Sequence, residues 1–481
     1  MTLPALSRRR FLAGAGIALT TIALPARPRA ATPAAEVAPD GFRILRAKAG
    51  SVRLRGANDA PTPIWGYDGV VPGPTLRVKR GEEVKVRLIN EIDQETVVHW
   101  HGLRLPNAMD GVPHLTQAPI APGKSFDYRF KAPDAGTFWY HSHERSSEQM
   151  GRGLYGVLIV EEPEPVEVDR DVVLVIDDWR LSQDGRIHES FGALMDAAHA
   201  GRLGQYITLN SNDTLDVPVK ANERLRLRLI NTANSRVFMV RFDRHRPRVM
   251  AVDGQPAEPS TAPNGRVLLG PGNRIDLYLD ATLEPGAKAK ILADDLRGGE
   301  LEIGRLVYDQ GTPVRAAALG DPKPLPPNPL PERMDFVGAL KKDVPLDGGM
   351  MSAMMMGMMR GGSSIPGYGI EPSRRIWALA GFASTGHDGP PLFTVKRGRT
   401  VMLSFINRTA FAHAMHVHGH HFRVLDARDD GWKPYWLDTV MVNVRETQRV
   451  AFVADNPGKW MIHCHMIEHM ETGMAAWFEV T

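Results

Sequence analysis

The only cysteine of the 481-residue chain, Cys464, stands in the stretch HCHMIEHMETGM between His463 and His465, and His469 and Met474 follow it closely. Thiolate, thioether and imidazole groups are the ligands that soft and borderline transition metals prefer. A single cysteine cannot form an internal disulfide, so Cys464 is a buried apolar residue, a reactive thiol or a metal ligand. The density of ligand-type residues around it raises the prospect of a metal centre.

Further His-x-His pairs are His99 and His101, His141 and His143, and His416 and His418. Residues i and i+2 of a strand project from one face and residue i+1 from the other. Each pair would therefore present two imidazoles on one face. The same rule directs His463 and His465 away from Cys464. His413 lies three residues before His416, an odd number, so it can face inward together with Cys464.

The segments that must position these pairs recur along the chain. PTLRVKRGEEVKVRLIN ends at Asn90, LDVPVKANERLRLRLIN at Asn231 and PLFTVKRGRTVMLSFIN at Asn407. Each joins a short strand through a turn to an alternating strand, which is typical of a β-sandwich. A His-x-His pair begins nine residues after Asn90 and after Asn407, whereas Val240 and Phe242 stand in that register after Asn231. The middle unit therefore keeps the strand and lacks the ligands.

A second correspondence supports the repeat, since FKAPDAGTFWYHSH and FVADNPGKWMIHCH have equal length and both end in His-x-His. Together the repeats predict an all-β chain of three consecutive β-sandwich domains. We expect the domains at residues 36–162, 165–315 and 374–481, with a Pro-rich linker and a Met-rich segment over 316–373.

Residues 1–35 resemble a twin-arginine export signal, in which Arg8, Arg9 and Arg10 precede an apolar run from Phe11 to Leu24. This run is too short to span a bilayer comfortably, so no stable membrane anchor is expected. The signal implies the twin-arginine export machinery as a partner and a periplasmic location. Residues 1–30 hold five arginines and no acid, so the formal charge of +3 becomes +3 − 5 = −2 for the remainder. That balance gives no reason to expect a nucleic-acid partner.

The inward-facing residues of the third domain make a set of two nitrogens and one thiolate: His413, Cys464 and His469, with Met474 placed as a weak axial thioether. This is the ligand set of a blue-copper electron-transfer site. The first domain cannot build this centre, because it has other residues at the equivalent positions: Thr96, Ser142, Ser147 and Arg152.

The outward-facing histidines of the first and third domains number eight, and they would meet across an interface between the two domains. Eight imidazoles suffice for three copper ions with open positions for oxygen. Reduction of O2 to two waters needs four electrons, which three such ions and the blue copper together can hold. Cys464 is bonded through the main chain to both His463 and His465, which gives a short covalent route between the two centres.

At these residues the sequence resembles the multicopper oxidases, which include laccases, bacterial cuprous oxidases and copper-resistance oxidases. The resemblance implies three consecutive cupredoxin-like Greek-key β-sandwich domains and four copper ions: one type 1, one type 2 and two type 3. It implies one-electron oxidation of a substrate coupled to reduction of O2 to water. By the same resemblance, the type 1 copper is held by His413, Cys464, His469 and Met474. The type 2 copper is held by His99 and His416. The type 3 pair is held by His101, His141, His143, His418, His463 and His465.

Two positions bear on proton delivery. Asp110 matches an acidic residue near the trinuclear site of bacterial members that is thought to relay protons. An ordinary Asp-Gly turn is an equally good interpretation of this residue. Many bacterial members have an acid directly after the second type 1 histidine, whereas this chain has Met470, with Glu468 and Glu471 nearby.

The Met-rich segment places seven thioethers within ten residues: Met350, Met351, Met354, Met355, Met356, Met358 and Met359. Clustered thioethers suit Cu(I), and the segment resembles the Met-rich insertion of bacterial cuprous oxidases. We therefore expect cuprous-ion oxidation for copper tolerance. One alternative is a laccase acting on phenols and aromatic amines, with the segment as a lid. A non-catalytic periplasmic copper-binding or buffer protein is the alternative of a different class.

The oligomeric state and the remaining histidines can also be predicted. Three domains can complete the copper cluster within one chain, so a monomer is expected. The histidines without a partner in the repeat are expected to be surface or core residues: His114, His188, His199, His245, His387, His420 and His421.

Overall fold

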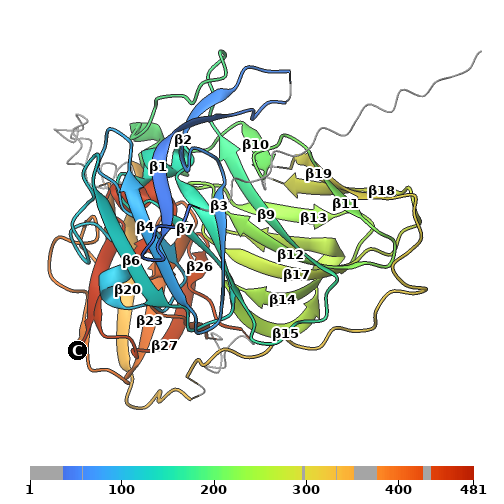
Figure 1. Cartoon of the computed structure of the whole chain (residues 1–481). Coiled ribbons are helices and arrows are strands. Elements are labelled where there is room, and N and C mark those ends of the chain that lie inside the picture. Colours follow the sequence, from blue (N-terminus) through green and yellow to red (C-terminus); the bar gives the residue numbers. More distant parts are fainter. Residues whose placement is uncertain (1–35, 57, 295–297, 332, 351–375, 426–434) are drawn as a thin grey trace, which may run out of the picture. The chain divides into compact units, whose positions relative to one another are not determined.

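The computed structural model describes residues 36–481 apart from residues 57, 295–297, 332, 351–375 and 426–434 (Figure 1). Residues 36–481 form one compact unit. The predicted signal segment and the Met-rich run after Met350 lie outside the described residues. Among the helices that the structure describes, none is long and apolar enough to cross a membrane. The described elements are almost all strands, which assemble into six sheets.

The first pair of sheets, drawn in blue and teal in Figure 1, lies within residues 43–161. One sheet has the order β2(Thr62–Tyr67), β1(Arg43–Val52), β4(Glu83–Asn90), β6(Ser125–Lys131). The other has the order β3(Gly73–Lys79), β8(Tyr155–Glu161), β7(Gly136–His141), β5(His99–His101). Alternate residues of β4 pack against Trp100 and Phe138 of the second sheet, so the core lies between the two layers.

The second pair of sheets lies within residues 170–308. Its larger sheet has the order β10(Tyr206–Leu209), β9(Arg170–Trp179), β12(Arg224–Asn231), β17(Arg274–Asp280), β14(Arg248–Val252), β15(Gln255–Thr261). Its smaller sheet has the order β11(Leu215–Val219), β19(Glu300–Tyr308), β18(Lys288–Asp294), β13(Phe238–Phe242), β16(Arg266–Leu269). Val240 and Phe242, in the register of the histidine pairs, are buried in the core of this sandwich.

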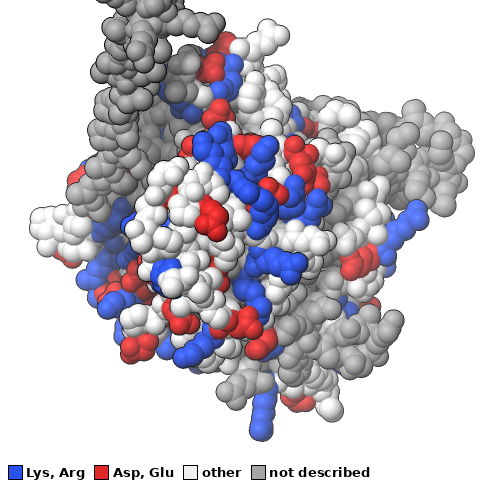
Figure 2. Space-filling view, turned by 90° about the vertical axis from the view of Figure 1, so that its right-hand side faces the viewer, with Lys and Arg blue, Asp and Glu red and all other residues white. Residues whose placement is uncertain are grey.

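Several ion pairs lie on the surface of this second sandwich. Basic and acidic side chains are interspersed on the face shown in Figure 2. Examples on the smaller sheet are Arg241 of β13 with Glu300 of β19 at 2.8 Å, and Arg305 with Glu302, both in β19, at 2.7 Å.

The third pair of sheets lies within residues 340–480. One sheet has the order β21(Trp377–Leu379), β20(Leu340–Gly348), β23(Thr400–Asn407), β27(Thr447–Val453), β25(Arg423–Val424). The other has the order β22(Thr394–Val395), β29(Ala475–Val480), β28(Gly458–Cys464), β24(His413–Val417), β26(Thr439–Val442). Strand β20 lies in the segment predicted as a linker, yet it pairs in parallel with β23. The third sandwich therefore begins earlier in the chain than residue 374.

The repeated asparagines make the same corner in each sandwich. Asn90, Asn231 and Asn407 are buried at the end of their strands. The side-chain oxygen of each accepts a hydrogen bond from the main-chain N–H two residues later, at 2.9–3.1 Å. The side-chain amide of each donates to main-chain carbonyls of the following loop and a neighbouring segment. These bonds fix the loop that leads into β5, β13 and β24.

Two short helices follow the strands that end in His-x-His. Helix α1(Ser146–Gly151) comes after β7, and helix α4(Ile467–Glu471) comes after β28. They meet through Glu468, whose side chain accepts hydrogen bonds from Ser147 at 2.7 Å and from Ser235 at 2.8 Å. The second sandwich thus takes part in joining the ends of the two histidine-bearing strands.

Candidate metal centres

The strand registers bring the four His-x-His pairs together two by two. In the first sandwich His99 lies opposite His141, and in the third sandwich His416 lies opposite His463. Met415 lies opposite Cys464, so these two side chains point to the other face, into the core. The tripeptide His463-Cys464-His465 thus places its histidines on one face of the strand and its cysteine on the other.

The two sets of histidines face each other across the junction of the first and third sandwiches. Ring centroids lie 3.9 Å apart for His101 and His416 and 4.0 Å apart for His99 and His418. His143 lies 5.1 Å from His463, and His101 lies 4.9 Å from His465. All eight predicted outward-facing histidines are buried.

Main-chain carbonyls orient several of these rings. The Nδ1–H groups of His99 and His416 donate to the carbonyls of Asp110 (2.7 Å) and Asp438 (2.9 Å). Those of His141 and His463 donate to the carbonyl of the next residue, each at 3.0 Å. This tautomer leaves each Nε2 as a lone-pair donor.

Whether a metal ion fits these histidines can be judged from their buried ring nitrogens and the hydrogen bonds that these make. Among the described residues no hydrogen-bond partner faces Nε2 of His99, His141, His143 or His416, or either nitrogen of His465. Burial holds the pKa of His141, His143, His463 and His465 well below the usual range, so these rings are neutral. Neutral imidazoles that converge with free, desolvated nitrogens fit metal ions, since such atoms would otherwise stay unsatisfied.

A second group surrounds the cysteine. Nδ1 of His413 lies 3.6 Å and Nδ1 of His469 lies 3.7 Å from the Cys464 sulfur, and the two nitrogens are 3.2 Å apart. The outer Nε2 atoms bond to the Thr409 hydroxyl at 2.8 Å and to the His199 carbonyl at 2.7 Å, which leaves both Nδ1 atoms facing the sulfur.

The cysteine group is closed to water. Met474 is fully buried in the same core cluster as Cys464, and its carbonyl accepts the Cys464 N–H at 3.0 Å. Burial raises the pKa of the Cys464 thiol to about 12, so a metal must displace the thiol proton. Two imidazoles, one thiol and a nearby thioether are the donor set that copper takes in electron-transfer sites.

Asp110 contacts the histidines of both sandwiches. It is buried, and besides the carbonyl contact to His99 its Oδ2 accepts a hydrogen bond from Nδ1 of His418 at 2.9 Å. A turn is also required here, because Gly111 has φ +76° and a Cβ there would lie 1.8 Å from the Val98 carbonyl oxygen. Asp110 therefore forms the turn and at the same time binds the histidine cluster.

Sequence reasoning missed two charged residues at this cluster. Asp438 is fully buried, and its Oδ1 lies 3.1 Å from Nε2 of His101. Arg274, from β17 of the second sandwich, grips both Asp438 oxygens at 2.9 and 2.6 Å. Burial alone would raise the pKa of Asp438, but Arg274 and His101 hold it well below the usual range. Neither residue belongs to the repeat, and an acid before a short strand is too common to be a signal.

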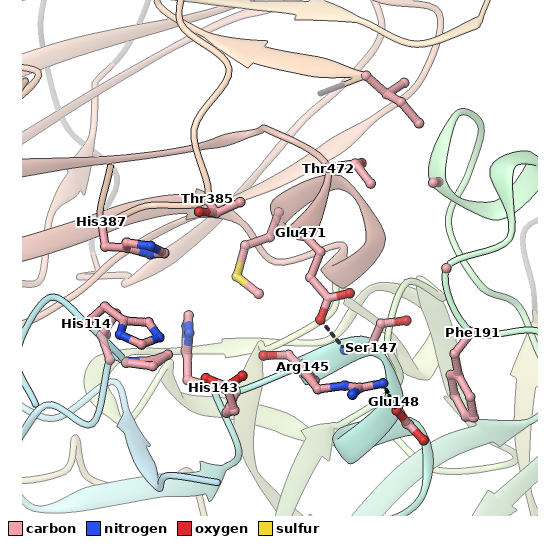
Figure 3. A pocket seen from close by; sticks show the side chains of 18 of the residues that line it. His114, His143, Arg145, Ser147, Glu148, Phe191, Thr385, His387, Glu471 and Thr472 are labelled. Atoms are coloured by element: carbon pink, nitrogen blue, oxygen red, sulfur yellow. Dashed lines mark hydrogen bonds and ion pairs between the residues drawn. The ribbon is translucent and has the colours of Figure 1, made fainter. Parts of the chain in front are cut away.

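Glu468 and Glu471, the two acids beside Met470, differ in their surroundings. Glu468 is buried and accepts four hydrogen bonds, from Ser147, Asn234, Ser235 and the Arg202 N–H. Burial raises the pKa of Glu471 to about 7, and this side chain accepts the Ser147 N–H at 2.8 Å. Glu471 faces a pocket rather than the polar network of Glu468 (Figure 3).

The seven remaining histidines divide between core and surface. His245, His420 and His421 are buried, His199 is half-buried, and His114, His188 and His387 are exposed.

Comparison with known proteins gives the family. Multicopper oxidase family models match residues 49–165, 171–288 and 371–481. The multicopper oxidase MmcO of Mycobacterium tuberculosis is 29% identical over 98% of this chain and 95% of its own length. A copper resistance protein A homolog of Pseudomonas syringae pv. tomato is 26% identical over 85% of this chain and 87% of its own. The crystal structure of a multi-copper oxidase from Pseudomonas thermotolerans is 35% identical, with a TM-score of 0.78 over 92% of this chain and 99% of that one.

The chain belongs to the multicopper oxidase family. Its all-β fold of cupredoxin-like sandwiches is confirmed by the strands of the structure and by the similarity to that crystal structure. The protein is an oxidoreductase with copper cofactors and with oxygen as the electron acceptor.

Proposed function

We propose that this oxidase takes single electrons from a substrate at a type 1 copper and reduces O2 to water at a trinuclear copper cluster. The type 1 ligands would be His413, Cys464, His469 and Met474. His99 and His416 would hold the type 2 copper. The type 3 pair would be held by His101, His141, His143, His418, His463 and His465. Bound copper supplies the one-electron redox chemistry of the reaction.

The chain's own residues connect and serve these two centres. Cys464 points into the core beside His413, while its main-chain neighbours His463 and His465 lie in the histidine cluster. A few covalent bonds therefore join the two sites. Asp110 would move protons at its Oδ2 atom, which bonds to Nδ1 of His418.

The observation that carries the substrate proposal is where the Met-rich segment begins. The Met350 N–H donates to the Ala198 carbonyl at 3.1 Å, and the next carbonyl, that of His199, accepts from Nε2 of His469. The Gly349 N–H donates to the Ile376 carbonyl at 3.1 Å. The described residues on either side of 351–375 thus lie together, next to the proposed type 1 histidine.

A thioether-rich segment that starts beside His469 suits Cu(I) as the substrate, because soft ligands prefer the cuprous ion. We propose oxidation of Cu(I) for copper tolerance, in line with the copper resistance protein among the relatives. We also propose export to the periplasm through the twin-arginine machinery, on the basis of Arg8, Arg9 and Arg10 and the apolar run after them. A monomer remains the expected state.

Oxygen uptake by the copper-loaded chain tests this proposal, with a stabilised Cu(I) donor and, separately, with a simple phenol. Three proteins are compared: the intact chain, a deletion of residues 350–359, and a variant with all seven methionines of that segment changed to leucine. The leucine variant keeps length and apolar character and removes only the thioethers. We expect both changes to abolish the Cu(I) rate and to preserve or raise the phenol rate.

Other outcomes favour the alternatives. If the leucine variant oxidises Cu(I) as fast as the intact chain, the segment is a lid and the laccase function for phenols and aromatic amines takes over. If the fully loaded protein consumes no oxygen with either substrate, it is a copper buffer.

A further inference from the structure

A pocket of about 690 Å³ reaches the histidine cluster from the surface (Figure 3). His143 lines the inner part of this pocket. Its ring centroid lies 5.1 Å from that of His463 and 5.2 Å from that of His418. His143 is only 5% exposed, and its Nε2 is among the buried ring nitrogens without a partner. The pocket thus gives a solute access to a residue of the proposed type 3 site.

Two exposed histidines from different sandwiches face each other in the same pocket. His114 follows β5 of the first sandwich and His387 precedes β22 of the third, and their ring centroids are 5.1 Å apart. Figure 3 shows both rings in the part of the pocket where His143 lies.

The spacing of this pair matches that of proposed copper ligands in the same molecule. The ring centroids of His413 and His469 are 5.0 Å apart, and those of His418 and His463 are 5.1 Å apart. His114 and His387 are exposed to solvent, so an ion arriving from solution can reach them.

The remaining charged and soft groups of the pocket favour a copper ion. Glu144, Glu148 and Glu471 line it, and the one basic residue among its lining residues, Arg145, is paired with Glu148 at 2.8 Å. The lining also contains the thioether of Met470. Acids attract the cation, and imidazole and thioether accept copper in either oxidation state.

We propose that His114 and His387 form a docking site for copper ions that pass through this pocket to the trinuclear cluster during metal loading. The site is solvent-exposed and has two imidazoles, so it holds the ion briefly and releases it inward. This inference rests on the proposed role of His143 as a copper ligand. It concerns assembly of the cofactor and not the oxidation of substrate.

The test uses the full chain with His114→Gln and His387→Gln together, and His188→Gln as the matched control, an exposed histidine outside the pocket. The copper-loaded proteins are titrated with Cu(II), and the additional ion is followed by its nitrogen hyperfine coupling in electron paramagnetic resonance. We expect intact chain and control to bind one additional ion, with an affinity about tenfold or more above that of the double variant. After removal of copper by a chelator, we expect the double variant to regain the paramagnetic resonance signal of the type 2 copper about tenfold more slowly, to the same final copper content.

Either of two results overturns the proposal: equal binding of the additional ion by the double variant, or an unchanged rate of reloading. Failure of the underlying ligand assignment looks different, because the intact chain itself would then fall short of four copper ions.

Discussion

The first and third sandwiches differ on the inner face of the strands that lead into His-x-His. In the third, Cys464 meets Nδ1 of His413 and of His469 at 3.6–3.7 Å. In the first, Ser142 and Thr96 occupy the corresponding places, and both hydroxyls donate to the side-chain oxygen of Gln149 at 2.6 and 2.8 Å. One inner face carries a donor set that could hold a metal ion, and the other is a closed hydrogen-bond network.

The outer faces of the same strands are alike, with histidines paired in the same register in both sandwiches. Because successive side chains of a strand point to opposite faces, the inner face could change while the outer histidines stayed. Ser147 and Arg152, the other predicted counterparts of type 1 ligands, bind Glu468 and Glu148 instead. The described residues of the second sandwich form neither site, and this sandwich contributes Arg274 to the cluster of the other two.

The largest effect is expected from giving the third sandwich the serine of the first. Cys464→Ser removes the thiolate, so we expect loss of the blue absorption and of one copper ion. Oxidase activity should fall by more than the ~10–100-fold typical of losing a hydrogen-bond partner of a ligand. Visible absorption, copper content and oxygen uptake measure this. The reciprocal Ser142→Cys is the control, and it should create no second blue centre, because Thr96, Ser147 and Arg152 supply no copper ligands.

The contribution of the second sandwich is tested next. Arg274→Met leaves the buried carboxylate of Asp438 without its cation, and removing one partner of a buried pair typically costs about 3–5 kcal/mol. Urea unfolding should show this loss in the free energy of unfolding, and the paramagnetic resonance signal of the type 2 copper should change as His416 and His101 lose their fixed partner. Arg274→Lys, which keeps the charge, should lose less. A cost below about 1 kcal/mol, as at exposed ion pairs, would contradict the role.

A change at Asp110 should affect the proposed oxygen-reducing cluster and leave the proposed type 1 site intact. Asp110→Asn keeps the size of the side chain and removes the carboxylate that bonds to His418. We expect oxygen reduction to slow by about 10–100-fold, while the blue absorption and copper content stay intact. Asp93→Asn, an exposed acid, is the matched control. An unchanged turnover number would refute the relay role and leave the Asp-Gly turn as the whole explanation.

The smallest effect concerns a histidine of the second sandwich. His245 is buried, donates from Nδ1 to the Asp243 carbonyl at 2.8 Å and lies 2.6 Å from the Tyr308 hydroxyl. Burial lowers the pKa of His245 below its usual value of 6.5, so the unfolded chain binds its proton first as the pH falls. Stability attributable to this residue is therefore present above pH 6.5 and is lost below it.

His245→Gln tests this sign. The free energy of unfolding of the intact chain minus that of the variant should shrink by about 1 kcal/mol or less per pH unit below pH 6.5. Urea unfolding between pH 7.5 and 5 measures the difference. A difference independent of pH would show that His245 takes up a proton equally well in the folded chain.

The parts that sequence could predict are those that follow from local geometry and repetition. The Ile-Asn corners and the His-x-His pairs recur at fixed spacing, and strand alternation sorts their side chains into inner and outer sets. Strand β20 could not be placed, because its pairing with β23 spans about sixty residues and its sequence follows a Pro-rich stretch. The same holds for Arg274 with Asp438, and for His114 with His387. These contacts depend on how sandwiches pack, and that packing leaves no periodic trace in the chain.

The central claim is that copper at these residues reduces oxygen. The most direct test loads the full chain with copper, determines the metal content, and measures oxygen consumed and hydrogen peroxide formed per electron supplied by a donor. We predict four copper ions per chain, one O2 consumed for every four electrons and no peroxide. A chain that holds its copper and consumes no oxygen would contradict the account.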